Sequence, residues 1–383
     1  AGDRPLDGRR IPGVVLMPDP AIAVNLLWCV PGDVGGSEEY LVRQLLGLAE
    51  AQSHLHPTLY VVDGFAEAHR HLTDLFPTVV ASFNGAWRVR RVAGEATWFR
   101  QRSKRADLRH HGGGVAPIRA VRPYVLTIHD LQYRTYPQYF SRTKRAYLAT
   151  MIGRSVRQAR MVAVPSQYVR ESVVEAYRVS PTKVRVVPHG FEPDLLQDIT
   201  AEDELRQRFA LGDGPVIVYP AVTHPHKNHK FLIDLLKTRW TDPDLRLVLT
   251  GASGAAERSV AAATDPRIRR VGRVSAADRN GLLKMAEAMV FPSQYEGFGA
   301  PLIEAMALGC PVIASDSTCI PAVVDNAGLV LPLSTAAWAD ALERVQKTRA
   351  TLIAAGLRRA KVFTARASGV ALAGVYRAAL EGP

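Results

Sequence analysis

The feature that most constrains the fold is an alternation of short apolar runs with longer, helix-like stretches. In the first half, AIAVNLLWCV (Ala21 to Val30) and PYVLTIHD (Pro123 to Asp130) have the length and composition of buried strands. The pattern restarts in the second half at GPVIVYP (Gly214 to Pro220). Strands that alternate with helices in this way form parallel sheets with helices on both faces. The sequence therefore predicts an α/β protein of two Rossmann-like, doubly wound domains.

Further apolar runs predict the remaining strands of both sheets. In the first half they are PTLYVV, TVVAS, ARMVAVPS and KVRVVPHG, and in the second half LRLVLTG, IRRVGRV, AMVFPS, PVIAS and AGLVL. The apolar periodicity of Leu41 to Leu48 predicts a helix after the first strand. We expect the two domains to meet near residues 190 to 215, with a ligand in the cleft between them.

Length and composition exclude several classes of protein. The chain has 383 residues, 47% of them hydrophobic, and no apolar run approaches the ~18 residues that a membrane span needs. The N-terminal AGDRPLDGRRIPG lacks the apolar core of a signal peptide. The cysteines Cys29, Cys310 and Cys319 lie in apolar sequence and are expected to be reduced core thiols. These features favour a cytoplasmic protein.

The positive charge is concentrated in one region. Between Ala81 and Arg160 there are 17 Lys or Arg against 3 Asp or Glu, which is +14, whereas the whole chain carries +12. Such a patch indicates an anionic partner, which could be a phosphate-bearing substrate, anionic lipid headgroups or nucleic acid; the alternative is only a solvated basic surface. No homeodomain, zinc-finger or RRM-type signature accompanies it. We therefore expect peripheral contact with anionic lipid at the inner face of the plasma membrane, and no nucleic acid partner.

The stretch YEGFGAPLIEAMALGCPVIASD (Tyr295 to Asp316) is the most informative local pattern. It predicts a strand, a glycine loop, a helix that begins near Pro301 and ends near Gly309, and a second strand. Ligands bind at this type of loop in parallel sheets. The N–H groups of Gly297 to Leu302 are expected to face the cleft at the positive end of the helix, where a phosphate is favoured.

Two glutamates flank this loop. Glu296 and Glu304 would repel a phosphate, but each can accept hydrogen bonds from hydroxyl groups. A nucleotide sugar, with hydroxyls at both ends and phosphates between them, satisfies all three features. The alternative is that Glu304 only favours the helix N-terminus and Glu296 is a solvated loop acid.

Other loops supply further candidate residues. Gly35 and Gly36 follow the first predicted strand and could let the backbone approach a phosphate, or form an ordinary turn. His129 follows a strand in TIHDLQY, where Asp130 could orient its ring. HHGGG, which contains His111, is interpreted as another cleft loop, and His189 in PHGF as a structural residue.

The stretch YPAVTHPHKNH (Tyr219 to His229) opens the second half. Lys227 is the natural group to neutralise a departing phosphate, and Asn228 could cap the helix that follows. Thr223 and His224 lie nearby. The clustered histidines raise the possibility of a metal, but no metal-site spacing accompanies them, so no metal ligand is assigned.

Taken together, these motifs resemble glycosyltransferase family 4, a group of retaining enzymes with the GT-B fold, over residues 20 to 380. Glu296-Gly-Phe-Gly-Ala-Pro-Leu-Ile-Glu304 is similar to the Glu, seven residues, Glu signature of the family. TIHDLQY, VPHGF and HKNH resemble further family motifs, and HKNH is typical of a mannosyltransferase-like subgroup. The resemblance implies an acceptor domain at 1–192, a donor domain at 193–362, and a helix at 363–383 that returns to the first domain.

The resemblance also implies roles for individual residues. His129, Lys227 and Glu296 would be catalytic: His129 and Glu296 at the donor sugar, and Lys227 at the leaving diphosphate. The donor would further contact Glu304 through its ribose. Other donor contacts would come from Gly35, Gly36, Gly272, Arg273, Val274, Gly297, Phe298, Gly299, Ala300, Pro301 and Leu302. His111, Asp130, His189, Thr223 and His224 would contact the acceptor or support these groups.

The implied activity is metal-independent, cofactor-free transfer of a hexose from a nucleotide sugar to a glycan or lipid-linked acceptor, with retention of configuration. GDP-mannose is the preferred donor, while UDP-glucose and dTDP-rhamnose stay open. Many family members carry Arg about six residues before Lys227, where this chain has Ala221. Other readings are a nucleotide-sugar epimerase, a phosphorylase, or a non-enzymatic binder of anionic surfaces.

Overall fold

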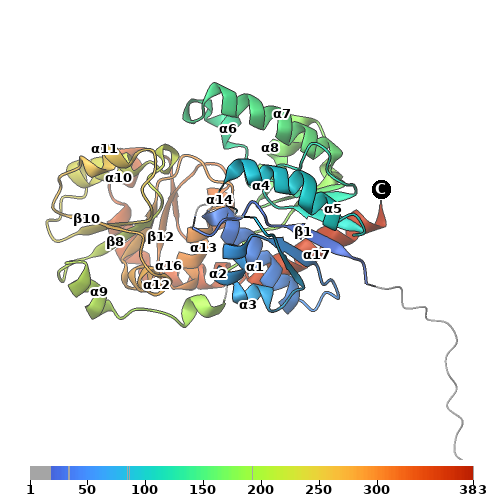
Figure 1. Cartoon of the computed structure of the whole chain (residues 1–383). Helices are drawn as coiled ribbons and strands as arrows, with labels where there is room; N and C mark the ends of the chain where they lie inside the picture. Colours follow the sequence, from blue (N-terminus) through green and yellow to red (C-terminus); the bar gives the residue numbers. More distant parts are fainter. Residues whose placement is uncertain (1–18, 33–34, 84, 86, 192, 383) are drawn as a thin grey trace, which may run out of the picture.

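Two parallel sheets organise the chain (Figure 1). The computed structural model describes residues 19–32, 35–83, 85, 87–191 and 193–382. The stretch 1–13, interpreted above as lacking a signal-peptide core, lies outside the described residues.

The first sheet has the strand order β3-β2-β1-β4-β5-β6-β7, and every neighbouring pair is parallel. Its strands are β1 (Ile22–Asn25), β2 (Thr58–Val61), β3 (Thr78–Val80), β4 (Leu108–His111), β5 (Tyr124–Thr127), β6 (Met161–Val164) and β7 (Val184–Val186). Most of them are short and fully buried, as expected for strands covered by helices on both faces.

The second sheet has the order β10-β9-β8-β11-β12-β13 and is also parallel throughout. Its strands are β8 (Val216–Pro220), β9 (Arg246–Thr250), β10 (Ile268–Gly272), β11 (Ala288–Phe291), β12 (Val312–Ser315) and β13 (Leu329–Leu331). The two sheets confirm the predicted doubly wound α/β architecture. The domain boundaries at 192 and 362 stay predictions.

Helices cover both sheets. They are α1 (Gly36–Glu50), α2 (Asp63–Ala68), α3 (Arg70–Thr73), α4 (Arg88–Gly94), α5 (Arg100–Arg102), α6 (Gln132–Thr135), α7 (Arg142–Gln158), α8 (Gln167–Tyr177), α9 (Glu202–Arg208), α10 (His229–Thr238), α11 (Glu257–Ala261), α12 (Ala276–Met285), α13 (Ala300–Ala307), α14 (Ile320–Val324), α15 (Thr335–Trp338), α16 (Ala341–Ala360) and α17 (Ala365–Glu381). Between α4 and α5, residues Glu95–Phe99 form a π-helical segment; short 3-10 turns lie at Pro137–Tyr139, Pro181–Lys183, Pro193–Leu196 and Pro225–Lys227.

Side-chain oxygens cap four of these helices. Ser141, Ser166, Ser275 and Thr364 each accept the N–H three residues further on, at the starts of α7, α8, α12 and α17. Such a cap satisfies a backbone donor that the helix itself leaves free. Asn228 precedes α10 but forms no side-chain cap, so that expectation was wrong. Its left-handed backbone, with φ of 58°, is a conformation that Asn tolerates better than most residues.

The prediction of a cleft loop at HHGGG was wrong for its two histidines. His110 and His111 end β4, which lies between β1 and β5 in the middle of the first sheet. His110 is bonded to Tyr376 Oη and Thr127 Oγ1, both at 2.8 Å. These partners satisfy the polar ring inside the sheet, which burial would otherwise penalise.

The last helix packs on the first domain. Helix α17 crosses α1, and Figure 1 shows it in red alongside that blue helix. The crossing depends on glycines: a Cβ on Gly47 would lie 1.7 Å from the Ala365 carbonyl oxygen, and one on Gly369 would lie 2.0 Å from the Gly47 carbonyl carbon. Only hydrogen at these positions permits so close an approach.

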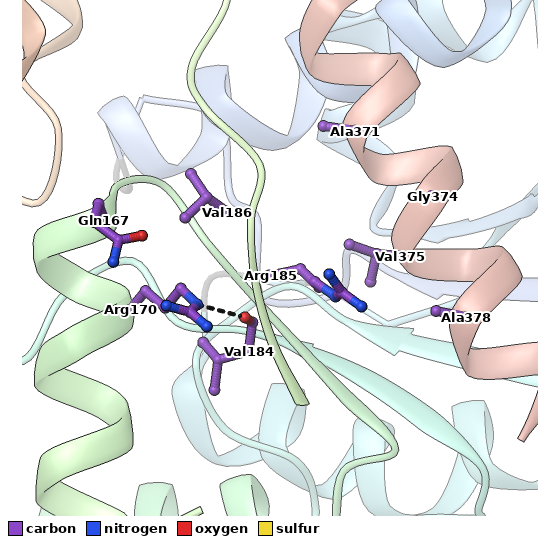
Figure 2. Close-up of a pocket in the computed structure, with 9 residues that line it drawn as sticks. All are labelled: Gln167, Arg170, Val184, Arg185, Val186, Ala371, Gly374, Val375 and Ala378. Carbon is purple, nitrogen blue, oxygen red and sulfur yellow. Dashed lines mark hydrogen bonds between the residues drawn. The ribbon is translucent and has the colours of Figure 1, made fainter. Parts of the chain in front are cut away.

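The outer edge of the first sheet is strand β7. Figure 2 shows Arg170 of α8 beside it, with its Nε donating to the Val184 carbonyl oxygen at 2.9 Å. This contact and the neighbouring α17 cover part of an edge that would otherwise present unpaired backbone groups. A hollow of about 540 Å³ separates β7 from Ala371 and Gly374 of α17.

Two smaller observations concern expectations from composition. Cys29, Cys310 and Cys319 are buried free thiols, as predicted. Within the residues that the structure describes, none of the helices combines the length and the apolarity that crossing a bilayer requires.

Candidate active site between the two sheets

The glycine loop after β11 lies against the first domain. The Tyr295 hydroxyl accepts the Leu131 N–H at 3.1 Å, and the Ser166 hydroxyl donates to the Gly297 carbonyl oxygen at 2.7 Å. A Cβ on Gly297 would lie 2.4 Å from the His129 carbonyl oxygen. Glycine is therefore required at 297 because backbone from the other domain occupies the place of a side chain.

Glu296 and Lys227 form an ion pair in this loop region. Lys227 Nζ lies 2.6 Å from Glu296 Oε1, and both side chains are largely buried. The Glu296 N–H donates to Thr318 Oγ1, whose hydroxyl donates back to the Glu296 carbonyl oxygen, both at 3.1 Å. The backbone that carries Glu296 is thus fixed, and its second carboxylate oxygen remains available to accept from a ligand hydroxyl.

Glu304 lies in α13 and is paired with arginines from both domains. Arg43 Nη1 of α1 lies 2.7 Å from Glu304 Oε1, and Arg279 Nη2 of α12 lies 3.8 Å from Oε2. Burial acts to raise the pKa of Glu304, but the charges of Arg43 and Arg279 lower it overall. The carboxylate is therefore ionised at neutral pH and remains an acceptor.

His129 follows β5 and contacts the loop that follows β4. Its Nε2 lies 2.8 Å from the Gly112 carbonyl oxygen, which fixes the proton on that nitrogen. Burial lowers the pKa of His129 to about 4, with the bond to Gly112 opposing the shift. The ring is neutral at pH 7. Asp130 does not orient it, because the Asp130 carboxylate accepts the Gln132 N–H at 2.9 Å instead.

A column of rings connects His129 to the glycine loop. Tyr40 lies edge-on to His129 at 5.6 Å and stacks on His189 at 4.3 Å. His189 stacks in turn on Phe298 at 4.9 Å. Burial lowers the pKa of His189 well below its ordinary value. The predicted structural role of His189 fits this position, because the neutral ring joins α1 to the loop of the second domain.

The start of α13 offers backbone donors. Among the described residues, the N–H groups of Gly297, Phe298, Gly299 and Ala300 have no acceptor. The Leu302 N–H donates to the Gly299 carbonyl oxygen at 3.0 Å, and Pro301 has no N–H, so the expected row of donors is shorter than predicted. Gly299 has a φ of 89°, which is the conformation that lets the chain turn into the helix.

Several predicted residues have other partners or other positions. Thr223 donates to Glu257 Oε2 and accepts the Gly254 N–H, both at 2.7 Å. Arg273, next to Gly272 and Val274 at the end of β10, reaches the Gly32 carbonyl oxygen of the first domain at 3.2 Å. Gly35 precedes α1 with a φ of 67°, and Gly36 begins that helix.

Two predicted histidines differ in their surroundings. His224 stacks with His226 at 5.7 Å beside Lys227. His111 is buried in β4 against Phe99 and Tyr124, and burial lowers its pKa to about 3. It therefore belongs to the core rather than to a loop. No group of three or more His, Cys, Asp or Glu side chains placed to hold a metal occurs in the described part of the chain.

Several residues that contact the site or connect the domains were missed by sequence reasoning. Arg43 and Arg279 meet Glu304, and the hydroxyls of Tyr136 and Tyr139 bond to the Gln294 carbonyl oxygen and Oε1, both at 3.2 Å. A signal existed for Arg43, which interrupts the apolar run LVRQLL of α1. A charge at such a position needs a partner.

Family models match both halves of the chain. Residues 34–195 match the model described as Glycosyltransferase Family 4, and residues 214–348 match the one described as Glycosyl transferases group 1. The first region contains strands β2 to β7, and the second contains β8 to β13.

Named relatives and a solved structure agree with this result. The chain is 28% identical over 276 residues to O-antigen chain mannosyltransferase B of Escherichia coli, covering 67% of this chain and 71% of that protein. It is 28% identical to O-antigen chain mannosyltransferase RfbU of Salmonella typhimurium, covering 60% and 63%, so the match spans less than two thirds of RfbU. HepE of Anabaena, in complex with UDP and glucose, superposes with a TM-score of 0.72 at 19% identity, covering 94% and 99%.

Proposed function

Because the chain belongs to the glycosyltransferases of family 4 with the GT-B fold, we propose that it transfers a hexose from a nucleotide sugar to a glycan or lipid-linked acceptor. The single observation that carries the proposal is the convergence of the Lys227–Glu296 pair and the glycine loop before α13 on His129 of the other domain. Both domains contribute to this site, as a two-substrate transfer requires.

Each group has a chemical role in the proposal. The free N–H groups of Gly297 to Ala300 and the ammonium of Lys227 meet the diphosphate and stabilise the charge that develops as it leaves. Glu296 accepts from hydroxyls of the donor sugar through its second oxygen. Glu304, ionised between Arg43 and Arg279, accepts from the ribose. The neutral His129 faces the donor sugar with its Nδ1 side, since its Nε2 is bonded to the Gly112 carbonyl oxygen.

The reaction proceeds with retention in this proposal. The acceptor oxygen attacks the anomeric carbon from the side on which the diphosphate departs, the bond from that carbon to the phosphate oxygen breaks, and the departing oxygen takes the acceptor proton. Protein groups supply positioning and electrostatic stabilisation. Because Lys227 and the N–H groups provide the positive charge, no divalent metal or other cofactor is needed.

The donor and the pathway are inferred from the relatives. Two of the matched proteins are named O-antigen chain mannosyltransferases, which supports GDP-mannose as the donor and a place in cell-envelope polysaccharide synthesis. The structure of HepE contains UDP and glucose, so a UDP-sugar is the main alternative to GDP-mannose as the donor.

Peripheral contact with an anionic membrane completes the proposal. Trp87 immediately precedes helix α4, which carries Val89 and Val92; their exposed fractions are 65%, 81% and 51%. Arg88 and Arg90 lie between them, and the Arg90 guanidinium lies 5.4 Å from the centre of the Trp87 ring. An exposed tryptophan among arginines is typical of segments that lie in the interface of anionic bilayers.

The first experiment is a thermal-shift panel with GDP, UDP, dTDP and ADP and their sugar conjugates, with EDTA and separately with Mg²⁺. A ligand at about 100 times its Kd stabilises the folded protein by about 2.7 kcal/mol. Selective stabilisation by a guanine nucleotide in EDTA is the expected result. Stabilisation by no nucleotide would exclude a working donor site, and a requirement for Mg²⁺ would exclude the metal-free reaction.

A further inference from the structure

A groove between α6 and α7 is lined by three arginines that the mechanism above does not use. Arg134 lies in α6, Arg142 begins α7, and Arg145 lies one turn further along α7. The hollow has a volume of about 630 Å³, which is within the usual range for small-molecule sites. Figure 1 shows α6 and α7 in green at the top of the view.

Within the described residues, no carboxylate forms an ion pair with any of the three guanidinium groups. Arg134 lies 5.9 Å from the centre of the Tyr177 ring, which helps to orient it. Arginines that line one groove without acidic partners suit the recognition of phosphate. The N-terminus of α7, a helix of 17 residues, adds its dipole to the same place.

The other residues that line the groove are uncharged and mostly apolar. They are Tyr133, whose hydroxyl is bonded to that of Tyr177 at 2.7 Å, Pro137, and Ala146 and Ala149 of α7. The groove therefore combines three arginines with carbon-rich side chains, which matches a phosphate ester better than a free inorganic anion.

The groove belongs to the segment that reaches the donor side. Tyr136 and Tyr139, which lie between α6 and α7, bond to Gln294, two residues before Glu296. A molecule held in the groove would thus extend toward the cleft.

We propose that this groove binds the phosphate group of the acceptor, through Arg134, Arg142 and Arg145. The inference rests on the proposed function, because it names the acceptor class for the same reaction: a phosphate or diphosphate ester. Such an ester could be lipid-linked or a soluble sugar phosphate. Both present the same oxygens to the three arginines.

The test measures binding of two esters with the donor site already filled. Protein saturated with the nucleoside diphosphate that stabilises it is titrated calorimetrically with farnesyl diphosphate and with glucose 1-phosphate. The variant R142Q/R145Q is compared with R105Q/R157Q, which removes the same charge from exposed positions outside the groove. Arg142 and Arg145 lie near the positive end of α7, so their removal is not expected to destabilise the helix.

The expected result is that at least one ester binds the wild-type protein and binds R142Q/R145Q at least tenfold more weakly. R105Q/R157Q should stay within about twofold, as should nucleotide affinity in both variants. Preference for the farnesyl ester would indicate a lipid-linked acceptor, and preference for glucose 1-phosphate a soluble one.

Four results would overturn the inference: no binding of either ester, equal binding by R142Q/R145Q, equal weakening in the control, or loss of nucleotide affinity in R142Q/R145Q. A failure of the proposed donor site can be distinguished from a failure of the groove. If no nucleotide binds, the proposed function fails, and the same titrations without nucleotide still compare the groove variants.

Discussion

Arg43 of the first helix and Glu304 of the second domain form a buried ion pair, with 2.7 Å between Nη1 and Oε1. The same guanidinium reaches the Gly190 carbonyl oxygen at 3.4 Å, in the segment that leads from one sheet to the other. A single side chain thus contacts α1, the interdomain crossover and α13. The pair holds the two domains together at the residue proposed to bind the ribose.

Replacing Arg43 should destabilise the protein more than an ordinary loss of charge would. R43Q leaves the Glu304 carboxylate buried with only the more distant Arg279, and removal of one partner from a buried pair costs about 3 kcal/mol. R344Q, which breaks an exposed pair with Asp340, should cost less than about 1 kcal/mol. Urea unfolding measures both, and equal midpoints for the two variants would contradict a structural role for the Arg43–Glu304 pair.

Glu296 and Lys227 should differ in what they do to binding and to turnover. E296Q should lower turnover about 100-fold, as expected for loss of a positioned polar group. It should not weaken binding of the nucleoside diphosphate, because Lys227 is released from its 2.6 Å pair with Glu296. K227Q should lower turnover and also weaken binding of the nucleoside diphosphate. K230Q, which removes an exposed lysine paired with Asp234, is the control. Weaker nucleotide binding by E296Q would show that the pair does not compete with the diphosphate.

Two glycines of α17 should respond in opposite ways to replacement by alanine. G369A places a Cβ 2.0 Å from the Gly47 backbone and should cost about 3 kcal/mol or more. Gly374 of the same helix has open space around it, so G374A should stabilise the protein by about 0.5–1 kcal/mol. Thermal unfolding of the two variants checks this, and a stable G369A protein would mean that the helices can separate without penalty.

Glu95 should make stability fall as pH rises. Burial raises its pKa from the ordinary 4.5 to about 7, while hydrogen bonding from Asn25 and the charge of Arg91 oppose the shift. The folded protein therefore keeps a proton that the unfolded chain releases near pH 4.5, and this contribution is lost between that pH and about 7.

E95Q keeps an oxygen for Asn25 but cannot ionise. It should exceed the wild type in stability at pH 8 by about 1–3 kcal/mol and match it near pH 4. Unfolding midpoints at several pH values test this, with the exposed E67Q as the control. A constant difference between E95Q and wild type across the range would exclude the titration of Glu95 as its cause.

Membrane contact should depend on both Trp87 and charge. Sedimentation with vesicles of phosphatidylcholine, with and without phosphatidylglycerol, should show binding only to the anionic vesicles, and salt should weaken it. W87S should bind more weakly than wild type, whereas Y147S, at an exposed position on α7, should not. Binding that is indifferent to salt would rule out an electrostatic attachment.

The strands were predictable where their side chains are apolar. Runs such as VIVYP and AMVF became β8 and β11 because strands covered on both faces consist of apolar residues. Strand β4 was missed because its sequence, LRHH, reads as polar. His110 is bonded to Tyr376 and Thr127, and Nδ1 of His111 lies 3.4 Å from Nδ2 of Asn25. These partners are distant in sequence, so no local pattern indicates the burial of the two histidines.

The candidate site divides in the same way. Glu296, Glu304 and the glycine loop follow a local spacing, and so the sequence located them. Their partners Arg43 and Arg279 come from other helices: the packing of the two domains brings Arg43 of α1 to Glu304, and the folding of the second domain brings Arg279 of α12 there. The Asp130 carboxylate was expected to face His129, but it bonds to the backbone two residues on, a local competition typical of aspartate.

The crossing of α1 by α17 also has a consequence for biosynthesis. The core of the first domain includes Leu372, Tyr376 and Ala379, which a ribosome makes more than 300 residues after α1. While the second domain is being synthesised, the first must wait with the apolar face of α1 uncovered and with His110 lacking its Tyr376 partner. The second domain, whose core cluster ends at Phe363, has all its residues earlier. The first domain is therefore synthesised first but completes its fold last. Nascent chains that stall before residue 365 should depend most on chaperones.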